Sequence, residues 1–204
     1  MTKNAWPELE AALFEMIDKI ERIVVEGGYQ GDPIEMYLAG GMAVNFYCGS
    51  RYTEDVDASF SRRILLSQDD LVVNYTKADG TTSYIYFDKN YNTSFALIHE
   101  DFEKDSVDWI RKDVNEKKIR LKVFSPVDLA VSKIARFSER DQSDIMELAA
   151  HDLFTHQQLR ERAMEALSYF VGNVLSVKNS IDIICRRIEA ETLPDRHIPP
   201  KNEP

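Results

Sequence analysis

The sequence predicts an α/β fold, with a small mixed sheet flanked by helices and a helical C-terminal half. Short apolar runs bounded by glycine or charged residues indicate buried strands in the first part of the chain, and apolar residues at helical spacing dominate the second. We therefore expect a core over residues 1–124, a helical part over residues 125–191 that completes the site, and a disordered, proline-rich tail over residues 192–204. A chain of 204 residues suits one domain with such an appended part.

The first part of the core should alternate helices and strands. Apolar residues recur at helical spacing after Pro7, which suits the first turn of a helix, and Gly27-Gly28 ends this pattern. A short apolar run, a second helical segment and a further strand-like run follow. The expected elements are a helix over residues 7–26, a strand over 34–39, a helix over 41–48 and a strand over 54–60.

The remainder of the core should add strands. Residues 71–76 and 82–88 flank Asp79-Gly80, a pair that favours a tight hairpin. Residues 103–118 are densely charged and predict a solvated helix or loop. Residues 119–124 alternate apolar and basic side chains, a pattern typical of a half-buried strand.

Capping signals indicate the helices of the second part. Ser125-Pro126 predicts a helix start, and that helix should run to about residue 137. A further helical stretch begins with Arg140-Asp141. Thr155 and Gln158 form a capping box that opens a third helix, and a fourth covers roughly residues 175–190. The last two helices either pack on the catalytic part as a cap or present one face to a partner.

Gly40-Gly41 ends the first apolar strand and opens the second helix. Glycine permits a close approach of the backbone and a positive φ. The first N–H groups of a helix have no partner inside it, so a helix start of this kind suits a phosphate. The simpler interpretation is that the glycines only form a turn.

Thr53, Asp55 and Asp57 alternate along the expected strand over residues 54–60 and its approach, so their side chains should share one face. Two close carboxylates repel each other when ionised, and Mg²⁺, which prefers carboxylate and phosphate oxygens, relieves that repulsion. A phosphate cradle beside metal-binding carboxylates indicates phosphoryl or nucleotidyl transfer. The alternative for the two aspartates is a solvated strand edge.

Two neighbours of these aspartates have open roles. Arg51 either contacts a triphosphate or pairs with Asp55 or Glu54. Thr53 could contact a phosphate or a ligand of the metal. The alternative is that it has no role in binding and reflects the preference of threonine for strands.

The glycine pair, the helix and Thr53-x-Asp55-x-Asp57 together resemble the signature of the minimal nucleotidyltransferase superfamily, which is related to DNA polymerase beta. A later stretch, from Ser125 to Asp144, resembles the Lys…Arg-Asp-x-x-Asp element of bacterial abortive-infection nucleotidyltransferases, the toxins of type IV toxin–antitoxin pairs. The resemblance covers roughly residues 34–150, and it implies a sheet of the nucleotidyltransferase type.

The resemblance implies transfer of a nucleotidyl group from a nucleoside triphosphate to an acceptor, with release of pyrophosphate. Asp55, Asp57 and a third carboxylate would hold Mg²⁺, while Gly40 and Gly41 would place backbone N–H groups on the phosphates. The third carboxylate would also act on the acceptor hydroxyl. Its candidates are Asp88, at the end of a strand, and the alternatives Glu100 and Asp101 after the next apolar run.

The second motif implies further nucleotide contacts. Lys133 matches the lysine of the toxins and would bind the triphosphate, and Asp141 matches their aspartate and would orient Lys133 or the acceptor. Asp144 lies one turn further on. Lys133, Arg136 and Arg140 would share a helix face if the helix continues that far. The alternative is a plain salt-bridge ladder, such as Arg140 with Asp144.

Composition limits the partners. The net charge of −10 gives no support to extended nucleic-acid binding, although a local basic patch could hold an acceptor end. The two cysteines, Cys48 and Cys185, lie far apart and indicate neither a disulfide framework nor a zinc site. No apolar run is long enough to span a membrane, and the N-terminus lacks a signal peptide, so we expect a cytoplasmic protein.

The resemblance also implies a biological role in a toxin–antitoxin or phage-defence system. The acceptor would be RNA, such as a tRNA end, or a protein, and the partner would be a cognate antitoxin. The acidic charge conflicts with an RNA acceptor, because phosphate contacts normally come from Lys and Arg. Two alternatives stay open: a catalytically degenerate module that binds nucleotides for regulation, or an antitoxin-type enzyme that modifies a partner toxin.

Overall fold

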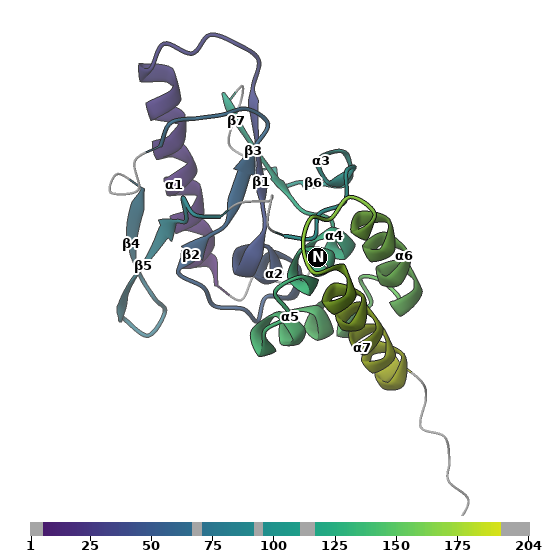
Figure 1. The fold of residues 1–204 in the computed structure, drawn as a ribbon. Helices are drawn as coiled ribbons and strands as arrows, with labels where there is room; N and C mark the ends of the chain where they lie inside the picture. The colour runs from purple at the N-terminus through teal and green to yellow at the C-terminus, as the bar shows by residue number, and fades with distance from the viewer. Residues whose placement is uncertain (1–5, 67–70, 92–95, 111–116, 193–204) are drawn as a thin grey trace, which may run out of the picture.

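The computed structural model describes residues 6–66, 71–91, 96–110 and 117–192 (Figure 1). It is a mixed α/β structure with a helical C-terminal region, as predicted. The elements are α1 (Pro7–Glu26), β1 (Ile34–Leu38), α2 (Gly40–Cys48), β2 (Asp55–Val56), β3 (Ala58–Phe60), β4 (Val72–Thr76), β5 (Thr82–Phe87), α3 (Phe102–Asp105), β6 (Val107–Asp108), β7 (Ile119–Val123), α4 (Pro126–Ile134), α5 (Glu139–Ala150), α6 (His156–Leu167) and α7 (Val174–Thr192).

The strands form two small sheets rather than one. A four-stranded sheet has the order β3-β1-β7-β6, in which β1 runs parallel to β7 and antiparallel to β3. A three-stranded sheet has the order β2-β5-β4, in which β2 runs parallel to β5. The predicted hairpin is confirmed as the antiparallel pair β4–β5.

The single strand predicted over residues 54–60 is wrong, because the chain changes sheets at Asp57. β2, before Asp57, pairs with β5, and β3, after it, pairs with β1. The N–H of Ala39 donates to the Asp57 carbonyl at 2.8 Å, and the N–H of Asp88 donates to the Val56 carbonyl at 3.1 Å. Asp57 therefore lies where the two sheets meet the start of α2.

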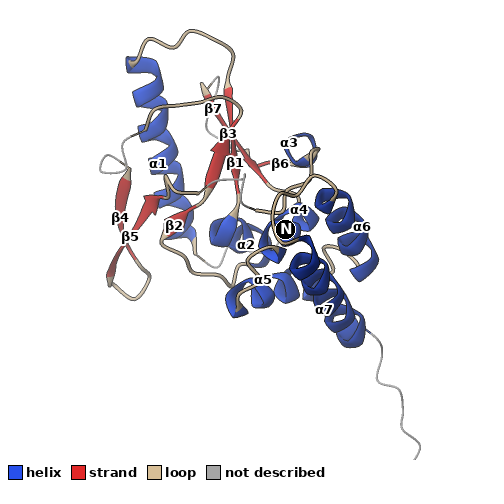
Figure 2. Cartoon of the chain, viewed as in Figure 1, coloured by secondary structure: helices blue, strands red, loops and turns tan. Residues whose placement is uncertain are grey.

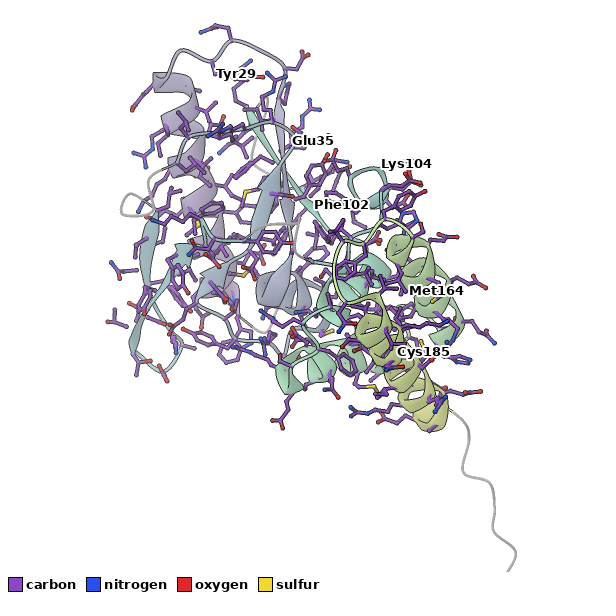
Figure 3. All side chains as sticks on the ribbon, viewed as in Figure 1. Tyr29, Glu35, Phe102, Lys104, Met164 and Cys185 are labelled. Carbon is purple, nitrogen blue, oxygen red and sulfur yellow. The ribbon has the colours of Figure 1, made fainter. Side chains whose placement is uncertain are left out.

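Apolar side chains join the sheets to the helices. The face of α1 that carries Leu9, Leu13 and Met16 is buried, and α1 packs on β4, β5 and β7. Phe102 of α3, labelled in Figure 3, packs against the four-stranded sheet, with its ring 5.7 Å from that of Tyr37 and 4.8 Å from that of Phe124. In Figure 2 the helices α4 to α7 gather on one side of the strands.

The helical region begins as its capping signals predict. Ser125 caps α4 by accepting a hydrogen bond from the N–H of Asp128 at 3.2 Å. However, α4 ends at Ile134 rather than near residue 137, and Phe137 takes a φ of 52° before α5 starts. The predicted helix face shared by Lys133, Arg136 and Arg140 is therefore wrong, since these residues lie on α4, on the link and on α5.

Two further predictions are refined. The capping box at Thr155 and Gln158 is confirmed at the start of α6. Residues 103–118 are not a uniform solvated segment, because they contain the end of α3 and the strand β6, which pairs with β7. Residues 111–116 of that segment lie outside the described residues, as does the predicted disordered tail except for Thr192, which ends α7. In the described parts of the chain, none of the helices has both the length and the apolar composition needed to cross a bilayer.

Candidate active site

A cavity of about 590 Å³ lies where the start of α2, the junction of the two sheets, and the helices α4 and α5 come together. Its size suits a nucleotide-sized ligand. Most residues predicted for the site line it, namely Gly40, Gly41, Arg51, Asp55, Asp57, Asp88, Lys133 and Asp141. Thr53 does not line the cavity, but its hydroxyl contacts the Asp55 carboxylate.

The glycine pair allows Asp57 to lie against the helix start. Gly40 has a φ of 60°, and a Cβ on it would fall 1.8 Å from Oδ2 of Asp57. A Cβ on Gly41 would meet the Thr53 side chain at 3.0 Å. The N-cap residue of α2 is Ala39, whose methyl side chain offers the first N–H groups no acceptor. A side chain at Gly40 would therefore clash with the Asp57 carboxylate, and one at Gly41 would crowd Thr53.

Three carboxylates gather on the sheet side of the cavity. Asp55 lies on β2, Asp57 follows it at the sheet junction, and Asp88 comes directly after β5, where its N–H bonds to Val56. Among the described residues, no Lys, Arg or His forms an ion pair within 4.0 Å of any of the three. Burial, together with the charges of Asp55 and Asp88, raises the pKa of Asp57 from 3.8 to about 6.

The third-carboxylate candidates are separated by the fold. Asp88 lines the cavity, whereas neither Glu100 nor Asp101 is among its lining residues. Glu100 accepts a hydrogen bond from the Tyr169 hydroxyl at 3.3 Å, and Asp101 is the N-cap residue of α3. His99, the other polar residue of that group, lies 3.0 Å from Glu165. The geometry therefore favours Asp88 for the third position.

Thr53 and Arg51 hold their neighbours in place. The hydroxyl of buried Thr53 donates to the Asp55 carboxylate and so orients it. Arg51 pairs with Asp144, with 3.3 Å between Nη1 and Oδ1, rather than with Asp55 or Glu54 as one interpretation expected. Its Nε atom is buried without a hydrogen-bond partner in the described structure. Since buried donors are normally satisfied, this atom is available to an acceptor in the cavity.

Cations line the helical side of the cavity. Two carboxylates of α5 have a basic partner there: Asp141, which lines the cavity, and Asp144, which does not. Nζ of Lys133 lies 2.8 Å from Asp144, and both side chains are almost fully buried. Arg136 makes two hydrogen bonds to Asp141, at 2.7 and 2.6 Å. The structure therefore gives Lys133 to Asp144 rather than to Asp141, and it shows no ladder from Arg140 to Asp144 in the described residues.

Asp141 has a structural role at the start of α5. It completes the capping box with Ser138, whose backbone N–H donates to it at 3.0 Å. Burial raises the pKa of Asp141, but the hydrogen bonds from Arg136 and Ser138 outweigh it and lower the pKa to about 2. The carboxylate is thus ionised and fully engaged.

A family model described as "Nucleotidyltransferase of unknown function (DUF6036)" matches residues 11–189, most of the chain. The chain belongs to this nucleotidyltransferase family. No curated protein matches the chain. Among solved structures, an antigenic nucleotidyltransferase-like protein from Paracoccidioides brasiliensis is similar, with 15% sequence identity and a TM-score of 0.40, over 86% of this chain and 93% of that one.

This nucleotidyltransferase family member also has cavity residues that sequence reasoning missed. Tyr91 lines the cavity, and its hydroxyl is buried without a hydrogen-bond partner in the described structure. Burial and the charge of Asp57 raise its pKa. A turn in which the N–H of Tyr91 bonds to the Asp88 carbonyl at 3.1 Å places it there. The spacing of Tyr91 three residues after Asp88 was the available signal, but such spacing alone is common.

Proposed function

We propose that the protein is a magnesium-dependent nucleotidyltransferase, which moves a nucleoside monophosphate from a nucleoside triphosphate to an acceptor hydroxyl and releases pyrophosphate. One observation carries the proposal: three carboxylates that have no ion-pair partner among the described residues line one cavity together with the start of α2, whose N-cap side chain accepts none of its N–H groups. Membership of a nucleotidyltransferase family supports it.

The donor set fits Mg²⁺. Asp55, Asp57 and Asp88 offer only hard oxygen ligands. Burial, and after it the charges of Asp55 and Asp88, raise the pKa of Asp57, and a divalent cation would relieve the repulsion among the three carboxylates. When bound, Mg²⁺ would offset the negative charge of the phosphates and lower the pKa of the acceptor hydroxyl. The glycine pair supports this fit, because the missing Cβ at Gly40 lets the Asp57 carboxylate lie directly against the start of α2.

The residues of this chain have distinct tasks in the proposed reaction. The N–H groups at Gly40 and Gly41 donate to phosphate oxygens, and Lys133 and Arg51 supply positive charge on the opposite side. The acceptor oxygen attacks the α-phosphorus while the bond from that phosphorus to the bridging oxygen breaks, and the electron pair leaves with pyrophosphate. Asp88 takes the proton from the acceptor hydroxyl.

A neighbouring surface supports an RNA end as the acceptor. A second cavity of about 370 Å³ shares Asp88 and Tyr91 with the first, and Arg62, Arg63 and Lys89 line it beside the partly exposed ring of Phe60. Basic side chains that follow a backbone and aromatic faces that stack bases are the means by which proteins bind single strands. This local basic surface supports an RNA end as the acceptor despite the net charge of −10.

The biological role belongs to the same proposal. A nucleotidyltransferase that caps an RNA end, such as a tRNA end, would block that RNA, which fits a toxin in a toxin–antitoxin or phage-defence system. A cognate antitoxin would then be the protein partner. This step rests on the resemblance of the glycine–aspartate and lysine–aspartate motifs.

The test incubates purified protein with Mg²⁺ and each α-labelled nucleoside triphosphate, with total RNA in one series and cell protein in another. Label should move to RNA with the wild type and with Asp79→Ala, an exposed carboxylate control, but not with Asp55→Ala/Asp57→Ala. Transfer to protein would replace the RNA acceptor. Nucleotide binding that requires Mg²⁺ but gives no transfer would identify a regulatory module.

The basic cavity has its own test. Arg62→Ser/Arg63→Ser removes two exposed charges beside Asp88 and should raise the KM for RNA about tenfold while kcat changes little, because each phosphate contact contributes mainly to binding. The matched control is Arg22→Ser, an Arg to Ser change on α1 outside both cavities. An unchanged KM for RNA would remove this surface from the acceptor site.

A further inference from the structure

A second cluster of potential ligands lies at the opposite end of α2 from the glycine pair. Cys48 is the last residue of α2, Glu147 is in the last turn of α5, and His151 is the C-cap residue of α5. Sγ of Cys48, a carboxylate oxygen of Glu147 and a ring nitrogen of His151 all lie within 4.8 Å of one another. Glu147 and His151 are four residues apart, which places them on the same side of α5.

The three groups are the ligand types that zinc prefers. A thiolate, a carboxylate and an imidazole in a tetrahedral zinc site lie about 3.4 Å from one another, so small side-chain rotations would bring this cluster to binding distance. Cysteine spacing in the sequence indicated no zinc site, because this cluster uses one cysteine and two residues about 100 positions further along the chain.

The electrostatics of the cluster favour a cation. The C-terminal ends of α2 and α5 meet there, and neither helix carries a basic residue in its last turn. Helix C-termini have a partial negative charge, which attracts cations. Burial and the charges of Glu147 and Asp144 raise the pKa of the Cys48 thiol to about 12. A bound transition metal reverses this effect, since it displaces the thiol proton.

The neighbouring contacts resemble those that orient metal ligands. The Ser50 hydroxyl donates to Oε1 of Glu147, and Nδ1 of His151 lies 3.0 Å from the Glu147 carbonyl oxygen. When Nδ1–H donates to that carbonyl, Nε2 keeps its lone pair for a metal, as in many histidine–metal sites. Cys48 is buried and His151 is exposed, so an ion can enter from the histidine side.

We propose that Cys48, Glu147 and His151 bind a zinc-class transition-metal ion that fastens α2 to α5 and leaves one coordination position to water. The site differs in kind from the carboxylate cavity, because a sulfur ligand selects Zn²⁺ or Co²⁺ over Mg²⁺. Its ligands lie next to the Arg51–Asp144 ion pair, three positions along the chain from each partner, so the ion fixes the segment that carries Arg51.

Co²⁺ is the probe, because a thiolate bound to Co²⁺ gives a charge-transfer absorption band that oxygen ligands do not give. Titration of untagged, metal-free protein should produce this band with a stoichiometry of one, and Zn²⁺ should abolish it. Asp55→Ala/Asp57→Ala should keep the band. Cys48→Ser should lose the band. The matched control is Cys185→Ser, which changes the second buried cysteine, on α7 (Figure 3), and should keep the band.

His151→Gln provides a second variant, because His151 is exposed and its side chain is not part of the hydrophobic core. It should weaken Co²⁺ binding about tenfold or more without changing the circular dichroism spectrum. The proposal is wrong if the wild type shows no band at saturating Co²⁺, or if the band survives Cys48→Ser. Should Cys48→Ser fail to fold, unchanged affinity in His151→Gln would overturn the proposal by itself.

Discussion

The sheet side and the helical side of the cavity at the start of α2 differ in how their carboxylates are paired. On the sheet side, Asp55, Asp57 and Asp88 lie together without an ion-pair partner among the described residues, and the pKa of Asp57 is raised to about 6. On the helical side, Asp141 and Asp144 are each bonded to a cation, and the pKa of Asp141 is lowered to about 2. Carboxylates that the protein leaves unbalanced are available to a ligand, whereas balanced ones position the side chains around it.

The largest expected change in stability comes from the helical side, where each carboxylate is paired with a cation. Asp144→Ala should lower the free energy of unfolding by about 3–4 kcal/mol, because it leaves buried Lys133 and partly buried Arg51 without their partner. Urea denaturation measures this loss, with Glu161→Ala, an exposed carboxylate on α6, as the control expected to change little. A loss below about 1 kcal/mol would mean that the Lys133–Asp144 pair is not held in the folded protein.

On the sheet side, removing a carboxylate charge should increase the stability of the protein instead of lowering it. The rise in the pKa of Asp57 from 3.8 to about 6 corresponds to roughly 3 kcal/mol of destabilisation above pH 6. Asp57→Asn removes the charge and should therefore stabilise the metal-free protein by about 2 kcal/mol at pH 8, while abolishing nucleotidyl transfer.

The difference in stability between the wild type and Asp57→Asn should depend on pH. The folded protein binds the Asp57 proton more tightly than the unfolded chain, so this group favours folding below pH 4 and loses that contribution as the pH rises to about 6. Thermal unfolding of wild type and Asp57→Asn should agree near pH 4 and diverge by pH 7. Equal stability of the two proteins at pH 8 would contradict the unbalanced-carboxylate interpretation.

Local chemistry made much of this comparison predictable from the sequence. Gly40-Gly41, the two alternating aspartates and the capping signals at Ser125 and Thr155 depend on neighbours a few residues away. The change of sheets at Asp57 was not predictable, because it depends on β2 pairing with β5 and β3 pairing with β1, strands that are distant in the sequence.

The ion pairs on the helical side of the cavity could not be predicted from the sequence either. The motif suggested Asp141 for Lys133, but α4 ends at Ile134, and the turn that follows brings Asp144 to Lys133 instead. Tyr91 and the basic residues beside Asp88 reach the site through a turn and a sheet edge. Sequence spacing predicts neither the Lys133–Asp144 pair nor the placement of these cavity residues, since both depend on how separate elements pack.

A smaller effect should follow when the balanced carboxylate of the α5 cap is neutralised. Asp141→Asn should cost about 1–2 kcal/mol at pH 7, a value reduced because the Arg136 side chain is 75% exposed to water. The lowered pKa means that this contribution is present above pH 4 and is lost as the pH falls towards 2. Urea midpoints of the two proteins should therefore differ at pH 7 and converge near pH 2. A difference that grows in acid would contradict the assignment.

The smallest expected effect is the stabilisation of the protein by Mg²⁺, which probes the sheet-side carboxylates with a ligand. Mg²⁺ at about ten times its dissociation constant should stabilise the wild type by about 1.4 kcal/mol at pH 8. Asp144→Asn, which keeps the three sheet-side carboxylates, should show the same increment on its lower baseline, and Asp55→Ala/Asp57→Ala should show none. Because the unbalanced charge is what the ion relieves, the increment should also fall as the pH drops below 6 and Asp57 takes up its proton. An increment that survives loss of both aspartates would place the ion elsewhere and leave the raised pKa of Asp57 without a functional counterpart.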